Sequence, residues 1–166
     1  AVTVSSSMLD SITEGILRNG AFLHDALEIL LRTELREPAV YNSILEAIAG
    51  GCNTPSRIAD RIHEDRSKVG KYLSTLQTIR ILERWVPCGE SERSRRAIYK
   101  ISDNFYSFWY RYVFTNKSYY EMLGVDDSAN EIMQDLSNYM GPVFEDICKQ
   151  YLMLEAMKRE LPFVPY

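Results

Sequence analysis

A polar helix face with several cations is the part of the sequence that has the clearest chemical use. Between residues 66 and 78, Val69, Leu73 and Leu76 recur at helical spacing, which leaves the opposite side of a helix to polar side chains. Arg and Lys at the start of a helix can bind phosphate oxygens, while Ser, Thr and Gln can hydrogen-bond base edges. The candidate DNA contacts on this helix are Arg66, Ser67, Lys68, Lys71, Tyr72, Ser74 and Thr75.

A second basic group lies in the polar loop at residues 89–96. Arg93, Arg95 and Arg96 suit the phosphate backbone or minor groove beside a helix that occupies the major groove. Basic loops of this kind also occur in winged helices that bind protein, and both basic groups can simply be solvated surface.

The net charge of the whole chain argues against nucleic-acid binding, but the distribution of charge along the chain favours it. The 166 residues carry a net charge of −4, but residues 66–100 hold nine Lys/Arg against three Asp/Glu, a local balance of +6. The remaining residues hold ten Lys/Arg against twenty Asp/Glu, a balance of −10. A basic segment in an acidic chain is typical of a nucleic-acid footprint. The acidic remainder could equally serve as an intramolecular partner for the basic face.

Other kinds of chemistry have less support. Cys52, Cys88 and Cys148 form no CxxC pair, and His24 and His63 stand alone, so we expect reduced thiols and no metal site. The sequence contains no phosphate-binding GxxxxGK[ST] loop. We therefore expect no cofactor, and no catalysis by this chain alone.

Two further features have a functional and a structural interpretation. Glu145 and Asp146, near the start of an expected helix, could bind a metal, but carboxylates in a first helical turn also stabilise the helix dipole. The aromatic residues between 103 and 114 could stack bases, but an aromatic stripe at helical spacing is more often core or an interdomain contact. We favour the structural interpretation for both.

The candidate contacts depend on a predicted winged helix-turn-helix between Glu37 and Ile101. A helix is expected over 39–49, and a second begins at Pro55 after a Thr54 N-cap and runs through Ile62. A turn at 63–65, with Asp65 capping, leads to the helix at 66–78. Strands expected at 82–86 and 97–101 form the hairpin, or wing.

Helices are expected on both sides of this domain, so the predicted fold class is mainly α with a small β-hairpin. Helices are expected over 7–18 and 24–35 before it, and over 103–114 and 118–123 after it. Two more are expected over 127–140 and 142–160, separated by a break at Gly141. We predict three segments: lid-like helices at 1–36, the winged helix at 37–101 and the aromatic start of a further domain at 102–166.

Several stretches resemble AAA-type ATPases of archaea and bacteria, of the STAND-like, DEXX-box kind. They are GAFLH at 20–24, LLRTELREP at 30–38 and ILEAIAG at 44–50, then YKISD at 99–103, FWYRYV at 108–113 and YMGPVFE at 139–145. The resemblance extends over nearly the whole chain from about Ser7. It implies an ATPase domain before this chain, a central winged helix and a restriction-endonuclease-like C-terminal region.

The chain departs from that family at both ends. The Walker lysine and Walker acid are missing, so ATP and Mg²⁺ are expected only for a parent protein. Glu145 matches the first acid of the nuclease-like region, but the later acids are missing, and nuclease activity is not carried over. The resemblance therefore identifies the chain as a fragment of a longer ATPase.

We expect a non-catalytic DNA-binding or regulatory module, with double-stranded DNA and the missing ATPase domain as partners. A homo-oligomer is also possible, and two alternatives remain open: a module that docks the ATPase core or another protein, and part of a nuclease-like enzyme. No apolar run approaches the roughly 20 residues that span a bilayer, so we expect a cytoplasmic protein without membrane contact.

Overall fold

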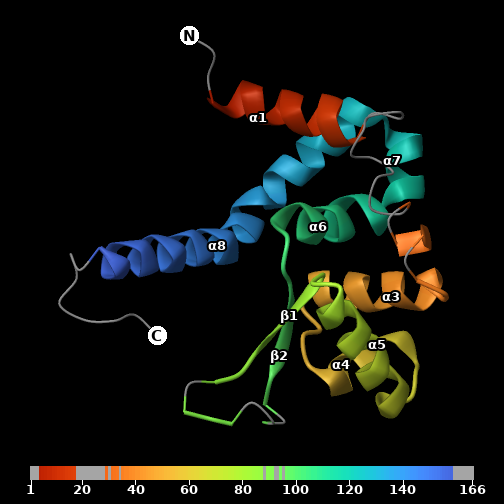
Figure 1. Ribbon diagram of the computed structural model, residues 1–166. Helices are drawn as coiled ribbons and strands as arrows, with labels where there is room; N and C mark the ends of the chain where they lie inside the picture. Colours follow the sequence, from red (N-terminus) through yellow and green to blue (C-terminus); the bar gives the residue numbers. More distant parts are fainter. Residues whose placement is uncertain are drawn as a thin grey trace. The chain divides into compact units, whose positions relative to one another are not determined.

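The computed structural model describes residues 4–17, 29, 31–33, 35–87, 89–91, 94 and 96–158, which are mainly helical (Figure 1). The chain divides into two compact units, Ala1–Ala129 and Asn130–Tyr166. The first unit begins with α1 (Val4–Ile12) and a π-helical segment, η1 (Thr13–Leu17). The expected helix at 7–18 thus begins earlier and continues as a π-helical segment to Leu17, while residue 18 lies outside the described residues. Much of the expected helix at 24–35 lies outside the described residues, although residues 29 and 31–33 are helical.

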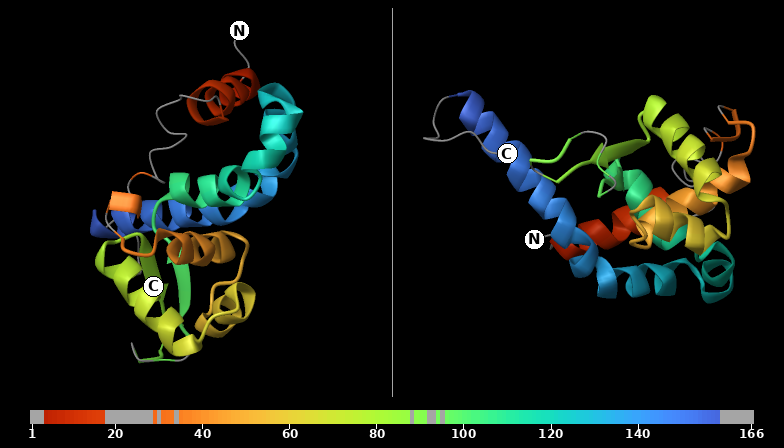
Figure 2. Two further views of the ribbon diagram at one scale, coloured as in Figure 1. Left: turned by 90° about the vertical axis from the view of Figure 1, so that its right-hand side faces the viewer. Right: turned by 90° about the horizontal axis from the view of Figure 1, so that it is seen from below.

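The predicted winged helix is confirmed. It consists of α3 (Pro38–Ala49), α4 (Pro55–Ile62) and α5 (Arg66–Thr78), followed by a hairpin of β1 (Leu82–Trp85) and β2 (Ile98–Ile101) (Figure 1, Figure 2). The helices α3 and α4 pack together, as do α4 and α5, while β1 contacts α5 and β2 contacts α3. The strands are antiparallel, with Leu82 opposite Ile101 and Trp85 opposite Ile98.

The core of the winged helix lies between α3, α4 and α5. The predicted stripe of α5 (Val69, Leu73 and Leu76) is fully buried, together with residues of the two other helices and of the hairpin. Those residues are Ile44, Leu45, Ile58, Leu82 and Ile101. The backbone N–H of Tyr99 also donates to the Asn53 carbonyl at 2.7 Å, which ties β2 to the α3–α4 connection.

The helix starts follow the expected capping residues with one exception. Proline is the first residue of both α3 and α4, where its missing N–H costs no helical hydrogen bond. Asp65 caps α5 by accepting from two backbone N–H groups. Thr54 stands at the N-cap position of α4, but its side chain makes no capping hydrogen bond.

All three helices of the winged helix end with the same backbone closure. At each end, an N–H just beyond the helix donates to a carbonyl five residues back: Cys52 to Ala47, Glu64 to Ala59 and Ile81 to Leu76. The closure places one residue in the left-handed region: Gly51 (φ 91°), His63 (φ 56°) and Arg80 (φ 61°). Only the first is a glycine, so the α4–α5 turn and the α5–β1 turn hold side chains in a region that they rarely adopt.

The aromatic segment is two elements, not the single α-helix expected over 103–114. Asp103 caps the short α6 (Asn104–Phe108), and a π-helical segment, η2 (Trp109–Phe114), follows directly. Both pack against α3, and Trp109, Tyr110 and Val113 are almost fully buried. The Tyr110 hydroxyl donates to the Asn42 side-chain oxygen of α3 at 2.6 Å. The structural interpretation of the aromatic residues therefore holds for these side chains.

The chain continues through α7 (Lys117–Leu123) into one long helix, α8 (Val125–Met157). The predicted break at Gly141 is wrong, because α8 runs without interruption through Gly141 and Pro142. A proline ring usually disfavours helical backbone at the preceding residue, partly by contact with its Cβ, and Gly141 has none. Residues 159 and 160 of the expected final helix lie outside the described residues.

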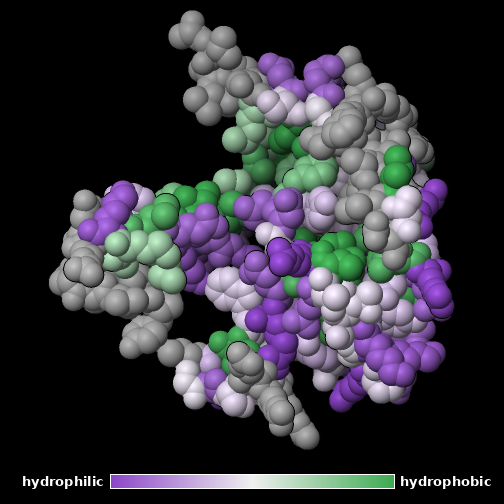
Figure 3. Space-filling view, viewed as in Figure 1, coloured by the Kyte–Doolittle hydropathy of each residue, from purple (hydrophilic) through white to green (hydrophobic). Residues whose placement is uncertain are grey.

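The division of the chain into segments at 36 and 101 stays a prediction. The second unit exposes large apolar side chains along α8, among them Phe144 and Ile147. Figure 3 shows hydrophobic side chains over this helix. Among the described residues, no helix is both long enough and apolar enough to cross a membrane.

Truncation of the buried stripe should destabilise the winged helix strongly. Leu73→Ala removes a fully buried side chain from the centre of α5 and leaves a cavity, which costs about 2–5 kcal/mol of unfolding free energy. Ser74→Ala, on the exposed side of the same helix, should change stability by about 0.5 kcal/mol or less. Urea denaturation measures both, and equal effects would contradict the assigned core.

Candidate nucleic-acid interface

The outward face of α5 lies opposite its buried stripe. Exposed side chains on this face belong to Ser67, Lys71, Ser74 and Thr78, with Gly70 among them. A Cβ added at Gly70 would meet no atom within 4 Å. The face is therefore shallow, with one long cation among small polar groups. Hydrophilic side chains also dominate the surface over α4 and α5 (Figure 3).

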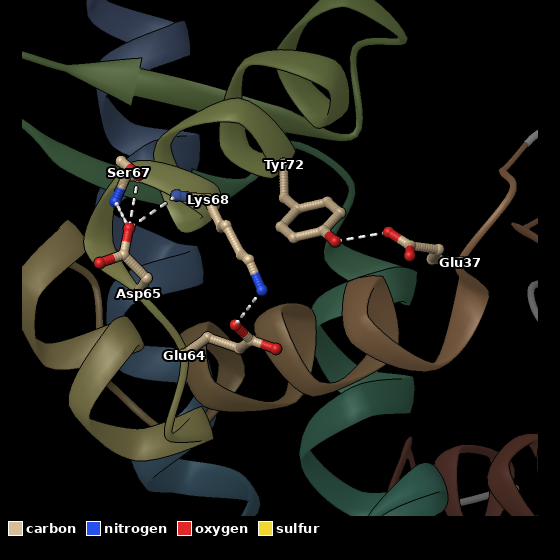
Figure 4. A network of polar contacts seen from close by, with 6 residues as sticks. All are labelled: Glu37, Glu64, Asp65, Ser67, Lys68 and Tyr72. Atoms are coloured by element: carbon tan, nitrogen blue, oxygen red, sulfur yellow. Dashed lines mark hydrogen bonds and ion pairs between the residues drawn. The ribbon is translucent and has the colours of Figure 1, made fainter.

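Ser67 is engaged at the start of the helix. Asp65 Oδ1 accepts from the Ser67 N–H at 2.8 Å, from the Ser67 hydroxyl at 2.5 Å and from the Lys68 N–H at 3.4 Å (Figure 4). These hydrogen bonds, that of the Ser67 hydroxyl first, hold the pKa of Asp65 below its ordinary value. The Ser67 hydroxyl thus takes part in capping, and a base contact would compete with that role.

Acidic neighbours partner two of the predicted cations. Lys68 Nζ lies 3.4 Å from Glu64 Oε2, and Arg66 Nη2 lies 3.8 Å from Asp60 Oδ1. All four side chains are at least partly exposed, so each ion pair contributes little and is screened by salt. A phosphate could replace either carboxylate, but it would first have to displace it.

Tyr72 points away from the outward face. Its hydroxyl donates to Glu37 Oε2 at 2.5 Å, at the start of α3 (Figure 4). Its ring meets the Tyr41 ring edge-on, with 5.0 Å between centroids. The hydrogen bond to the Glu37 carboxylate raises the pKa of Tyr72 to about 12.

The seven residues predicted as DNA contacts on this helix therefore differ in position and in the partners that they already have. Lys71 and Ser74 share the outward face, whereas the half-buried Thr75 donates its hydroxyl to the Lys71 carbonyl at 3.2 Å. Arg66 and Lys68 are exposed beside acids, Ser67 is part of the cap, and Tyr72 is turned toward α3. Their contact with DNA stays a prediction.

The hairpin loop holds its own polar network. Arg96 Nη1 lies 2.9 Å from Glu90 Oε1, and Glu90 also accepts from the Ser94 hydroxyl. Arg84 Nη2 donates to the Ser94 carbonyl at 2.7 Å. The Ser94 and Arg96 hydrogen bonds lower the pKa of Glu90, and that with Glu90 raises the pKa of Arg96. The predicted contacts Arg93 and Arg95 lie outside the described residues.

Sequence reasoning missed the acids that surround the basic face. Glu64 could have been found, because it lies four residues before Lys68 in a short capped turn. The sequence held no signal for Glu37, because 35 residues separate it from Tyr72. On the outer face of the hairpin, Lys100 Nζ lies 5.5 Å from the Trp85 ring centroid, a cation–π contact that was also not expected.

The described residues offer no competing metal centre. They contain no group of three or more His, Cys, Asp or Glu side chains that could hold a metal ion. Glu145, the candidate nuclease-like acid, is exposed on α8. Cys52 and Cys148 are free thiols, while Cys88 and His24 lie outside the described residues.

The Tyr72–Glu37 contact should make stability depend on pH in the alkaline range. The folded-state pKa of Tyr72 lies above its ordinary value of 10.0, so the stabilisation is complete below pH 10.0 and is lost as pH rises toward about 12. Tyr72→Phe and Glu37→Gln should therefore show a shallower fall in unfolding free energy between about pH 9 and about pH 11 than the parent chain. Urea denaturation at both values tests this. Glu46→Gln, on the same helix, should keep the parent slope, and identical slopes for all four proteins would contradict the assigned contact.

Comparison with known proteins finds relatives without an assigned activity. Residues 109–166 match the DUF234 family model, described as archaeal and bacterial proteins of unknown function. The chain is also 36% identical over 154 residues to the uncharacterized protein MJECL04 of Methanocaldococcus jannaschii. That alignment covers 93% of this chain and 35% of the relative, so the chain spans about a third of the relative's length.

One solved structure shares a general likeness. It is the C30AH42A mutant of Lactococcus lactis ZitR in apo form, with 14% sequence identity and a TM-score of 0.37 over 82% of this chain and 92% of that chain. At this TM-score the likeness carries no argument about fold or function. The chain is thus similar in sequence to archaeal and bacterial proteins. The similarity extends over 93% of the chain in the case of the M. jannaschii protein, of which it covers 35%.

Proposed function

We propose that this chain is a DNA-binding regulatory module of a longer prokaryotic protein. The supporting observation is the outward face of α5, which presents Lys71 and Ser74 on a helix held by a complete winged helix. The major groove, about 12 Å wide, admits one α-helix, and the small side chains of this face allow close approach to base edges. The hairpin then lies beside the groove, where Arg96 can reach the adjacent backbone.

Charge supports the same arrangement. The segment from residue 66 to residue 100 has a balance of +6, and the described part of it contains several exposed cations. The exposed ion pairs of Arg66, Lys68 and Arg96 are weak enough for phosphates to replace their carboxylate partners. Lys71 stands at the middle of the face, so it is the cation that we assign first to the duplex.

The identity of the parent protein belongs to the same proposal. The relative's greater length supports a longer parent protein. The sequence resemblance alone supports a parent of the AAA-type ATPase kind, whose ATPase domain would bind ATP and Mg²⁺. The chain itself would contribute recognition and no catalytic group. Glu145 is exposed on α8, and its match to the first acid of the nuclease-like region supports no catalytic role by itself.

A second candidate is a protein-docking module, which one observation favours. Asp60, Glu64 and Asp65 lie around the start of α5, where a groove-binding helix approaches phosphates. Acids at that position repel DNA but suit a partner surface that carries basic groups. Binding to DNA and docking to protein make opposite predictions for these residues.

Reversing the charge of Lys71 should distinguish a direct contact of this side chain with DNA from the general attraction between DNA and a positively charged protein. Lys71→Glu should weaken binding to a mixed-sequence duplex by about tenfold or more at about 50 mM salt, because it removes one phosphate contact and adds a repulsion. Lys149→Glu makes the same change of net charge on α8 and leaves every residue of the proposed interface unchanged, so binding should stay within about twofold of the parent chain. Fluorescence anisotropy at about 50 mM and about 200 mM salt measures both.

The triple variant Arg93→Glu, Arg95→Glu and Arg96→Glu belongs to the same titration. It should weaken binding across all duplex sequences and flatten the salt dependence. Equal affinity for the parent chain, Lys71→Glu and the triple variant, or no binding by the parent chain at about 50 mM salt, favours docking over DNA binding.

Removal of the acid that holds Lys68 should strengthen binding. Glu64→Gln frees Lys68 and deletes a negative charge near the phosphates, so duplex affinity should rise about two- to fivefold. Glu46→Gln on α3 serves as the matched control and should bind like the parent chain. A loss of affinity in Glu64→Gln would contradict the placement of the start of α5 against DNA.

A further inference from the structure

The contact between Glu37 and Tyr72 joins the start of the winged helix to α5, across 35 residues of sequence (Figure 4). Glu37 is the last residue before α3, and Tyr72 lies near the middle of α5. Of these three helices, consecutive ones pack against each other, α3 against α4 and α4 against α5. The contact is therefore a direct connection between α3 and α5 that does not pass through α4.

Glu37 lies between a proline and a buried leucine. Pro38 follows it as the first residue of α3, and a residue before proline has a narrow range of backbone angles. Two residues earlier, Leu35 is buried, and its N–H donates to the Leu31 carbonyl at 3.0 Å, with Leu31 fully buried. A displacement of Leu31 and Leu35 relative to α3 can therefore reach Glu37 through Arg36, the one residue between Leu35 and Glu37.

The contact can be broken without loss of the fold. Glu37 is exposed and Tyr72 is half-buried, so water can replace either partner in the hydrogen bond. The Tyr72 ring keeps its edge-on contact with Tyr41 even when the hydroxyl is absent. Loss of the hydrogen bond should thus change the position or mobility of α5 more than the stability of the core.

We propose that Glu37 and Tyr72 form a positioning link, through which the polypeptide that leads into α3 sets the orientation of the outward face of α5. This inference rests on the proposed DNA-binding function for its effect on affinity, but not for its effect on α5. Tyr72 is then a positioning residue and not a DNA contact. A change in the segment before Pro38 would reach the duplex through this hydroxyl.

The test combines two readouts on Tyr72→Phe, Glu37→Ala, Glu37→Gln and the double variant Glu37→Ala with Tyr72→Phe. Amide hydrogen exchange should quicken in α5 but not in α3 or the hairpin for Tyr72→Phe and Glu37→Ala. Duplex affinity should fall about three- to tenfold in both. Glu37→Gln keeps an acceptor oxygen and should recover most of the affinity.

Non-additivity identifies the pair as one unit. The double variant should bind no more weakly than either single variant, because the same hydrogen bond is lost in all three. The matched controls are Tyr106→Phe, which removes a tyrosine hydroxyl on α6, and Glu46→Ala, which removes a carboxylate from α3. Both should match the parent chain in α5 exchange. Additive losses, or Tyr72→Phe indistinguishable from the parent chain in both readouts, would overturn the link.

A separate measurement tests whether a change in the segment before α3 reaches α5 through Tyr72. Leu35→Val, a mild change of a buried side chain, should alter α5 exchange in the parent chain and have no such effect in the Tyr72→Phe background. An equal effect in both backgrounds would overturn the link. If the parent chain binds no duplex, the DNA-binding proposal fails, and the exchange data alone decide the link.

Discussion

The packing of α3 on two sides is the interaction on which the rest of the first unit depends. It packs against α4 and β2 and buries Ile44 and Leu45 completely, and each such side chain contributes about 1.5–3 kcal/mol when removed from water. Toward the aromatic segment it meets α6 and η2, with the Tyr110–Asn42 hydrogen bond between them. The aromatic residues thus support the winged helix. They hold α3 from the side of α6 and η2, and α3 in turn helps to position α5.

How far the sequence predicts the structure depends on the distance over which each signal acts. The bounds of α5 follow from local features, because Asp65 caps the helix and Val69, Leu73 and Leu76 form a stripe at helical spacing. The break expected at Gly141 was wrong because a glycine before a proline removes a clash as well as lowering helix propensity. The wider π-helical turns of η2 depend on tertiary packing around the aromatic side chains, which periodicity alone cannot describe. Lys71 and Ser74 could be placed on the outward face, but no sequence pattern connects Tyr72 with Glu37.

Acids and cations alternate around the proposed interface, and this limits how basic the free surface is. The carboxylates of Asp60, Glu64 and Glu90 each lie beside a cation that a phosphate would otherwise attract. Such exposed pairs add little to folding, so their main physical effect is to set the cost of exchanging one anionic partner for another. A surface of this kind binds polyanions weakly when they make only single contacts. It binds more tightly a ligand that replaces several carboxylates together.

The three identical helix closures carry a consequence for how the domain can diverge. Backbone hydrogen bonds close the turns at 51, 63 and 80, so side chains of the outward face take no part in closing the turns that join α3, α4, α5 and β1. Ser74 and Lys71 support none of these turns with their side chains, and space above Gly70 is open. Under the proposed function, substitutions at these positions can change DNA specificity while the fold of the winged helix stays the same, so α5 is also a suitable site for an engineered specificity.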